Sequence, residues 1–293
     1  MTSIECVLHS GAVLGESPWW DKDDQRLWWV DIRKRLLHCF DPAECLDISY
    51  DVGEQLGCAV RQKSGGLLLA MESGIYSFNP SESTKILKAS LDINYQGQRF
   101  NDGCTDPVGR FWVGSMIDDG GPAKQMGRIY RLDMDGKLSA FFKPVFTANG
   151  IAFAPDGKYM YFADTNRAVQ TIWVCEYDLE TGIPSKPKTF LGCDDLAGRP
   201  DGATVDVDGC YWFAAVGGWS IVRVTPKGKI DRTIKLPIEK PSKVMFGGDS
   251  LDTLFVTSIS EKISNRPAQP DAGSLFAIYG LGTTGIAQNR YSD

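Results

Sequence analysis

The sequence predicts an all-β fold, a six-bladed β-propeller with a central channel. Six short runs rich in aromatic and β-branched residues recur along the chain, and almost no segment has the 3.6-residue periodicity of a helix. The runs begin near residues 26, 66, 110, 159, 210 and 253, so the repeat is between 40 and 51 residues long. A repeat of that length in an all-β chain is typical of a propeller with one four-stranded blade per repeat.

Each run is bounded as a strand should be. The runs cover residues 26–31, 66–70, 110–115, 159–165, 210–215 and 253–258. Each follows a turn segment such as Asp156-Gly157 or Asp208-Gly209, where glycine supplies the positive φ of a tight hairpin. Most are followed by a second strand-like segment. Coincidental spacing in a β-sandwich would not give six matches in register, so we expect six repeats over residues 10–280 and one domain over residues 1–293.

Composition excludes several classes of function. The chain has 293 residues and a net charge of −6, without a basic stripe, which argues against a nucleic-acid partner. No apolar run reaches the roughly 20 residues that span a bilayer, and no secretory signal begins the sequence. The eight cysteines include no CxxC pair and read as reduced thiols, so we expect a cytoplasmic protein with no membrane contact and no obligate protein partner.

Equivalent positions of the six repeats should meet at one end of the channel. Counting 9 to 11 residues back from the start of each run gives a ring of Glu16, Gly57, Asn101, Asn149, Asp201 and Ser242. Four of these are carboxylates or amides, which are costly to bury unless something satisfies them. With only two histidines, His9 and His38, expected at the surface or in packing, a three-histidine metal site is impossible. The oxygen donors suit Ca²⁺, Mg²⁺ or Mn²⁺, and Zn²⁺ or Fe²⁺ with several waters stays open.

Four motifs together resemble the SMP-30/gluconolactonase family, which includes regucalcin and bacterial sugar lactonases. They are GESPWW (15–20), RFNDG (99–103) followed by DPVGRFWVGSM (106–116), ANGIAFAPDGKYMYFADT (148–165) and RPDGATVDVDGCYWFA (199–214). The resemblance covers essentially the whole chain. It implies a six-bladed propeller that holds one divalent metal ion and hydrolyses aldonolactones. Carried over by position, the metal ligands are Glu16, Asn149 and Asp201, and the substrate-binding residues are Arg99 and Asn101. Asp119 matches a further acidic substrate contact, but it is one methylene shorter than the family's usual Glu.

The residue types then predict a mechanism. A metal-bound lactone carbonyl is polarised, and Asp201 accepts the proton of the attacking water. A Ser-His-Asp triad is not expected, because neither histidine lies in the ring and no GxSxG occurs. One alternative is a non-catalytic, Ca²⁺-binding regulatory propeller of the regucalcin type, and another is a structural propeller for protein contacts. Arg99 and Asn101 favour the enzyme that acts on a small sugar lactone, because an ion site alone needs no substrate-orienting arginine.

Two further segments are expected to be irregular. The polar, proline-containing segment 261–272 reads as a loop that borders the pocket. The segment 164–166 follows the fourth strand-like run and reads as a capping turn, with a place at the mouth of the channel as the alternative.

Overall fold

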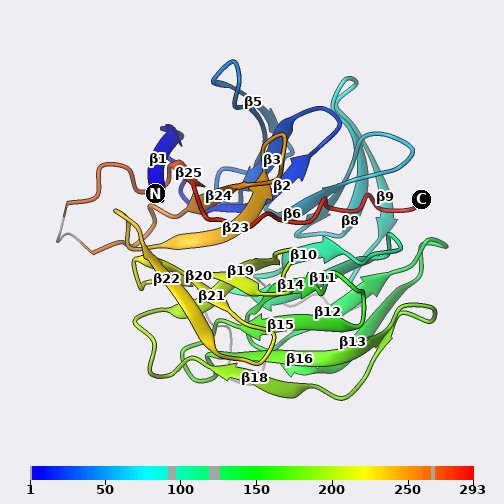
Figure 1. Ribbon diagram of the computed structural model, residues 1–293. Helices are drawn as coiled ribbons and strands as arrows, with labels where there is room; N and C mark the ends of the chain where they lie inside the picture. The colour runs from blue at the N-terminus through cyan, green and yellow to red at the C-terminus, as the bar shows by residue number, and fades with distance from the viewer. Residues whose placement is uncertain (1, 92–96, 119–125, 265–267) are drawn as a thin grey trace.

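The computed structural model describes residues 2–91, 97–118, 126–264 and 268–293, and none of these residues is α-helical. Their strands form six antiparallel sheets arranged around a channel (Figure 1), which confirms the predicted six-bladed propeller. No helix in the described residues is long and apolar enough to cross a membrane.

The first three blades follow one another along the chain, each built from consecutive strands. Blade 1 comprises β2 (Gly15–Asp21), β3 (Arg26–Asp31), β4 (Leu36–Asp41) and β5 (Leu46–Asp51). Blade 2 comprises β6 (Leu56–Arg61), β7 (Leu67–Met71), β8 (Ile75–Asn79) and β9 (Thr84–Ala89). Blade 3 comprises β10 (Gln98–Thr105), β11 (Phe111–Ile117), β12 (Gly127–Leu132) and β13 (Leu138–Val145).

The other three blades complete the ring. Blade 4 comprises β14 (Ala148–Phe153), β15 (Tyr159–Asp164), β16 (Thr171–Asp178), the two-residue β17 (Ile183–Pro184) and β18 (Lys188–Gly192). Blade 5 comprises β19 (Arg199–Val205), β20 (Tyr211–Val216), β21 (Ser220–Val224) and β22 (Ile230–Lys235). Blade 6 comprises β23 (Pro241–Gly247), β24 (Thr253–Ser258), β25 (Leu275–Tyr279) and β1 (Ser3–Leu8).

The six predicted runs are the second strands of the blades, from β3 to β24. Two of them, β3 and β24, have the predicted bounds, and the other four differ by one or two residues. These strands are buried on both faces between neighbouring strands and blades, which explains their aromatic and aliphatic composition. The tryptophans of blade 1 at positions 19, 20, 28 and 29 are all buried, so they pack the blade.

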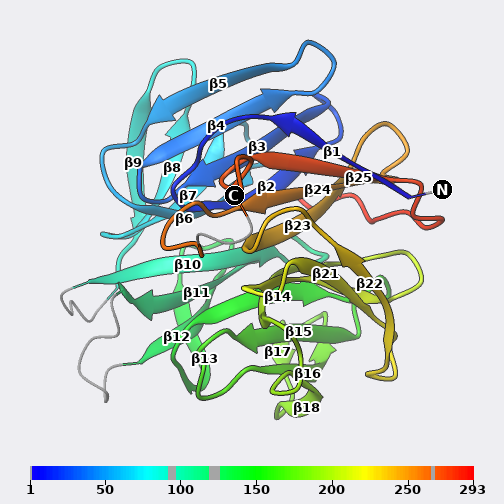
Figure 2. The same ribbon diagram turned by 90° about the vertical axis from the view of Figure 1, so that its left-hand side faces the viewer.

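Blade 6 closes the ring by joining the two ends of the chain. Strand β1 pairs antiparallel with β25, with Ser3 opposite Tyr279 and Glu5 opposite Ala277 (Figure 2). The expected repeats began at residue 10, so this closing strand lies outside them. The pairing removes the free edge that β25 would otherwise present.

The C-terminal segment after β25 runs across the end of the channel that lies away from the ring residues. Tyr291 forms an isolated bridge with Gln62, and Gly285 forms one with Asp206, so the segment touches blades 2 and 5. Ser292 N also donates to Gly109 O in blade 3 at 2.9 Å. The segment thereby ties together blades that are distant in sequence.

Candidate functional site

All six innermost strands contain a β-bulge at the predicted ring. The pairing register shifts after Glu16, around Gly57, between Phe100 and Gly103, after Asn149, between Pro200 and Ala203, and around Ser242. A bulge re-aims the side chains beside it, and bulges are common next to active sites. The repeat position that the sequence singled out is therefore the position where every inner strand departs from regular pairing.

The ring surrounds one polar pocket of about 200 Å³ at this end of the channel. Typical drug-sized sites are larger, so this volume suits a small ligand. Every predicted site residue that the structure describes lines it: Glu16, Arg99, Asn101, Asn149 and Asp201. Asp119 lies outside the described residues.

Two of the six ring positions, Gly57 and Ser242, place no functional group in the pocket. A Cβ at Gly57 would lie 2.3 Å from Phe100 O, so the neighbouring inner strand leaves no room for one. Ser242 donates its hydroxyl hydrogen to Gly15 O and lies near Thr257 Oγ1 at 2.9 Å, so it fastens blade 6 to blade 1. The functional groups of the ring are therefore the two carboxylates and two amides.

Glu16 and Asp201 form a pair of buried carboxylates without a cationic side chain in contact among the described residues. Burial, followed by the charge of Asp102, raises the pKa of Glu16 to about 7. Burial, followed by the charge of Glu16, raises the pKa of Asp201 well above its ordinary value. Two carboxylates that oppose each other's ionisation in a buried site are stabilised by a cation between them. A divalent metal ion bound between Glu16 and Asp201 would supply this positive charge.

Asn149 is held with its amide oxygen turned toward the other polar groups. The Thr165 hydroxyl donates to Pro200 O at 2.7 Å, so its oxygen must accept from Asn149 Nδ2, which lies at 2.7 Å. Asn149 Oδ1 then accepts from Asn101 Nδ2 at 2.8 Å and keeps a second lone pair. Glu16 and Asp201 line the same pocket, so the three side chains could offer only oxygen donors, the kind that hard cations prefer.

Arg99 binds the oxygen of the Asn101 amide, whereas Asn149 binds its nitrogen. Arg99 Nη1 donates to Asn101 Oδ1 at 2.6 Å, and Arg99 Nε donates to Asp118 Oδ2 at 3.0 Å. Asp118 also accepts from Arg33 Nη1 at 2.7 Å. Although burial alone would raise the pKa of Asp118, the two guanidinium groups lower it. The carboxylate is therefore ionised and fixes the arginine that the sequence predicted for substrate binding.

The channel beneath the ring is crossed by an ion pair. Lys243 of β23 and Asp102 of β10, both almost fully buried, contact each other through Nζ and Oδ1. Lys243 Nζ also donates to Gly103 O at 3.1 Å, and Asp102 Oδ2 accepts from Ile151 N at 3.3 Å. The ion pair directs Lys243 to Asp102, and among the described residues neither Glu16 nor Asp201 has a basic nitrogen within 4.0 Å.

Several residues in or beside the pocket were missed or only partly predicted, and those missed include Arg33, Arg199 and Lys240, which line it. Asp118 follows strand β11 with no motif to distinguish it from a surface residue. Thr165 was placed in a capping turn, and Asp164 does cap that turn, because its Oδ1 accepts from Asn166 N at 3.0 Å. Thr165 itself lines the pocket, as the alternative expectation for this segment had it. Glu261 and Lys262 also line it, so the predicted loop does border the pocket.

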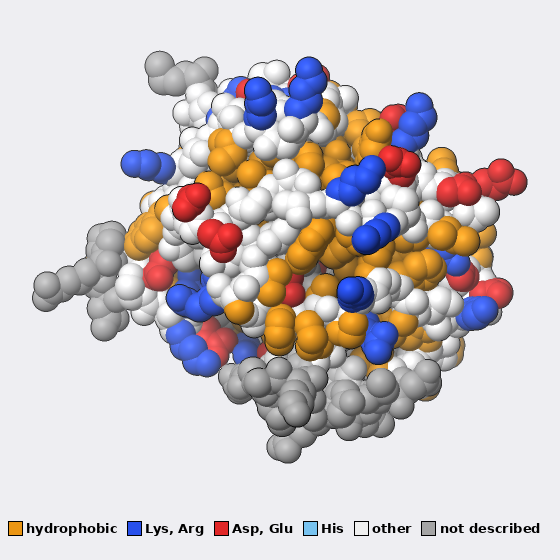
Figure 3. Space-filling view, turned by 90° about the horizontal axis from the view of Figure 1, so that it is seen from below, with side chains coloured by type: hydrophobic (Ala, Val, Ile, Leu, Met, Phe, Trp, Pro, Cys, Tyr) orange, Lys and Arg blue, Asp and Glu red, His pale blue; other side chains and the backbone are white. Residues whose placement is uncertain are grey.

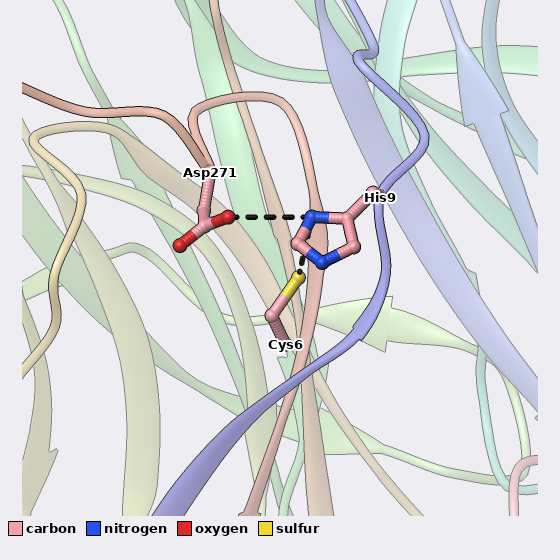
Figure 4. Close-up of side chains that lie close together, drawn as sticks. All are labelled: Cys6, His9 and Asp271. Atoms are coloured by element: carbon pink, nitrogen blue, oxygen red, sulfur yellow. Dashed lines mark hydrogen bonds and ion pairs between the residues drawn. The ribbon is translucent and has the colours of Figure 1, made fainter.

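Another group of potential metal ligands lies on the outside of blade 6. His9 Nδ1 is 3.5 Å from Cys6 Sγ and 3.2 Å from Asp271 Oδ1 (Figure 4). The His9 side chain is 74% exposed, which agrees with the surface role expected for it. His38 instead stacks on Trp29 with ring centroids 3.9 Å apart, as expected of a packing residue. The contacts of His9 Nδ1 with Cys6 and Asp271 are enough to explain why these three side chains lie together.

A larger hollow of about 710 Å³ lies on the outer face of blades 3 and 4 and is mainly apolar. Its walls include Phe141, Phe142, Trp173 and Pro187, with Lys143 and Lys186 among them. Figure 3 looks onto this side of the molecule and shows hydrophobic side chains gathered there with basic ones between them. None of the ring residues lines this hollow, so the polar pocket is the candidate site.

Comparison with known proteins places the chain in a family. Residues 14–260 match the family described as the SMP-30/gluconolactonase/LRE-like region. A 6-deoxy-6-sulfogluconolactonase of Pseudomonas putida is 34% identical over 94% of each chain, and regucalcin of Xenopus laevis is 32% identical over 99% of this chain and 98% of its own. The crystal structure of regucalcin from Agrobacterium tumefaciens, described as a calcium-binding protein, has a TM-score of 0.92 and 26% identity, and the match covers 99% of this chain and 98% of that one. The chain therefore belongs to the SMP-30/gluconolactonase family.

Proposed function

We propose that the protein is a metal-dependent hydrolase that opens aldonic acid lactones. The observation that carries the proposal is the pair of buried, mutually opposed carboxylates, Glu16 and Asp201, beside an asparagine oxygen and an anchored arginine in one small polar pocket. Glu16, Asn149 and Asp201 would hold one divalent cation, of which Ca²⁺, Zn²⁺, Mn²⁺, Mg²⁺ and Fe²⁺ are candidates. When bound, the cation would supply Lewis-acid polarisation of the lactone carbonyl.

The side chains around the cation would orient the substrate and accept the proton. Arg99 and Asn101 form one hydrogen-bonded unit and would orient the hydroxyls or ring oxygen of the sugar lactone. Asp201 would accept a proton from the water that attacks the carbonyl carbon. The bond from the carbonyl carbon to the ring oxygen then breaks, and that oxygen takes up a proton to give the open aldonic acid.

The anchored arginine also weighs against a purely ion-binding propeller. Arg99 is fixed by Asp118 and Asn101, and its position contributes no ligand to a cation. A regulatory Ca²⁺ site would gain only repulsion from this positive charge. The name gluconolactonase among the relatives is in line with the enzyme, and the name regucalcin keeps the binding protein as the alternative to test.

The decisive experiment is a pH-stat measurement of acid release from γ- and δ-aldonolactones, with protein loaded with each metal in turn and with chelator-treated protein. Turnover above the spontaneous rate that chelator removes supports the proposal. The absence of such turnover on a broad lactone panel, with metal binding shown by calorimetry, supports the non-catalytic alternative. Asp201→Asn tests the base, and Asp156→Asn in an exposed turn is its matched control. If Asp201→Asn binds metal and keeps near-normal turnover, Asp201 is not the base.

A further inference from the structure

Five cationic side chains line the pocket, but they are not neutralised equally: Arg33, Arg99, Arg199, Lys240 and Lys262. Arg33 and Arg99 share the carboxylate of Asp118, and Lys262 Nζ lies 3.6 Å from Glu261 Oε1. Within the described residues, neither Arg199 nor Lys240 has a carboxylate oxygen within 4.0 Å. Arg199 and Lys240 are therefore the two pocket cations without a direct ion-pair partner in the described part of the chain.

Both side chains are held in place by backbone carbonyls. Arg199 Nη1 donates to Thr165 O at 3.1 Å, which uses one of its five N–H donors. Lys240 Nζ donates to Glu261 O at 2.9 Å and to Lys262 O at 2.7 Å, which uses two of its three. The remaining donors of both groups make no hydrogen bond to another described residue. Fixed cations with spare donors are suited to bind an anion.

The two residues come from neighbouring inner strands on one side of the pocket. Arg199 begins β19 of blade 5, and Lys240 directly precedes β23 of blade 6. Burial lowers the pKa of Lys240, Glu239 partly opposes this, and the positive charge of Arg199 lowers it further. Placing two partly buried cations within range of each other is unfavourable until an anion joins them.

We propose that Arg199 and Lys240 form an anion-binding subsite, and that the lactone substrate carries an anionic group on its carbon chain away from the lactone carbonyl. This inference rests on the proposed function of the same pocket. Arg199 is two residues from Asp201, so a carboxylate, phosphate or sulfonate on the last carbon of one sugar unit lies within reach when the carbonyl is at the ring. Their shared chemistry is a negative group that accepts several charge-assisted hydrogen bonds.

Arg199 has one competing role, which is to offset the charge of Asp201. The positive charge of Arg199 does lower the pKa of Asp201. If this is the only role of Arg199, removing the guanidinium would slow the hydrolysis of every lactone to the same extent. A subsite for an anion predicts that only charged lactones are affected, so the ratio of two substrates separates the two roles.

The test measures kcat/KM on the neutral glucono-δ-lactone and on lactones of the same sugar that carry a phosphate, a sulfonate or a carboxylate on the last carbon. The wild type, Arg199→Gln, Lys240→Gln and the exposed control Lys186→Gln are compared. We expect the wild type to prefer at least one charged lactone by tenfold or more. Arg199→Gln should lower that preference about tenfold or more, since it removes a charge-assisted contact. Lys240→Gln should lower it in the same direction, and Lys186→Gln should not change it.

Equal losses on neutral and charged lactones, or a wild type that prefers the neutral one, would overturn the subsite. If no lactone is turned over, the proposed function fails, and calorimetric binding decides the subsite by itself. The probes are then gluconate and its three analogues with the charged terminal group, titrated into metal-loaded protein. Tighter binding of a charged analogue that is lost in Arg199→Gln supports the subsite, and equal affinity for all four contradicts it.

Discussion

The Thr165 hydroxyl fixes the amide of Asn149, because it donates to Pro200 O and can only accept from Asn149 Nδ2, at 2.7 Å. We predict that Thr165→Val, which keeps the shape and removes the acceptor, weakens metal binding by about 10- to 100-fold, as loss of a supporting contact to a ligand does. Thr165→Ser should bind like the wild type. Calorimetric titration of Ca²⁺ and Mn²⁺ measures this. Unchanged affinity in Thr165→Val would show that Asn149 is not oriented in this way or is not a ligand.

Asp118 positions Arg99 without lining the pocket itself. We predict that Asp118→Asn raises KM for sugar lactones more than it lowers kcat, because Arg99 loses its ionic anchor at 3.0 Å while the metal ligands stay in place. Steady-state kinetics and metal titration of the same variant separate the two effects. Asp156→Asn, in an exposed turn away from the pocket, is the control. A variant Asp118→Asn with wild-type KM would remove Asp118 from the positioning of substrate.

Glu16 makes the stability of the metal-free protein depend on pH. Burial and Asp102 raise its pKa from 4.5 to about 7, so the native state favours protonated Glu16 more than the unfolded chain does. The resulting stabilisation is present below pH 4.5 and is lost as the pH rises through 7, with a total on the order of 3 kcal/mol.

Urea unfolding of chelator-treated protein between pH 5 and 8 checks this, with Glu16→Gln as the variant that lacks the titration. The free energy of unfolding of the wild type relative to Glu16→Gln should fall with rising pH. Saturating metal should reverse that trend, because the cation binds the ionised carboxylate in competition with protons. A difference that does not vary with pH would contradict the raised pKa of Glu16.

The sequence predicts the repeat better than it predicts the contacts between repeats. The second strands from β3 to β24 carry their own pattern of aromatic and branched residues, and the ring residues follow from counting back to the bulges. Strand β1 is found only through its pairing with β25, more than 260 residues away, which no local pattern reveals. Asp118 and Thr165 act through Arg99 and Asn149, and a single chain read in order does not show which distant side chain a polar residue supports.

The ion pair between Lys243 and Asp102 is the last feature with a measurable consequence. Burial alone would lower the pKa of Lys243, but the Asp102 carboxylate outweighs it and the pKa is raised, so the lysine is charged inside the channel. Lys243→Met leaves Asp102 unpaired and should cost about 3–5 kcal/mol of the free energy of unfolding. The double variant Lys243→Met/Asp102→Asn removes the unpaired buried charge and should recover more than half of that loss.

The control is Lys158→Met, which breaks an exposed pair with Asp156 and should cost at most about 1 kcal/mol of the free energy of unfolding. Urea unfolding of the wild type, of these three variants and of Asp102→Asn measures these values, and additive losses in the double variant would mean that the two charges do not stabilise each other across the channel.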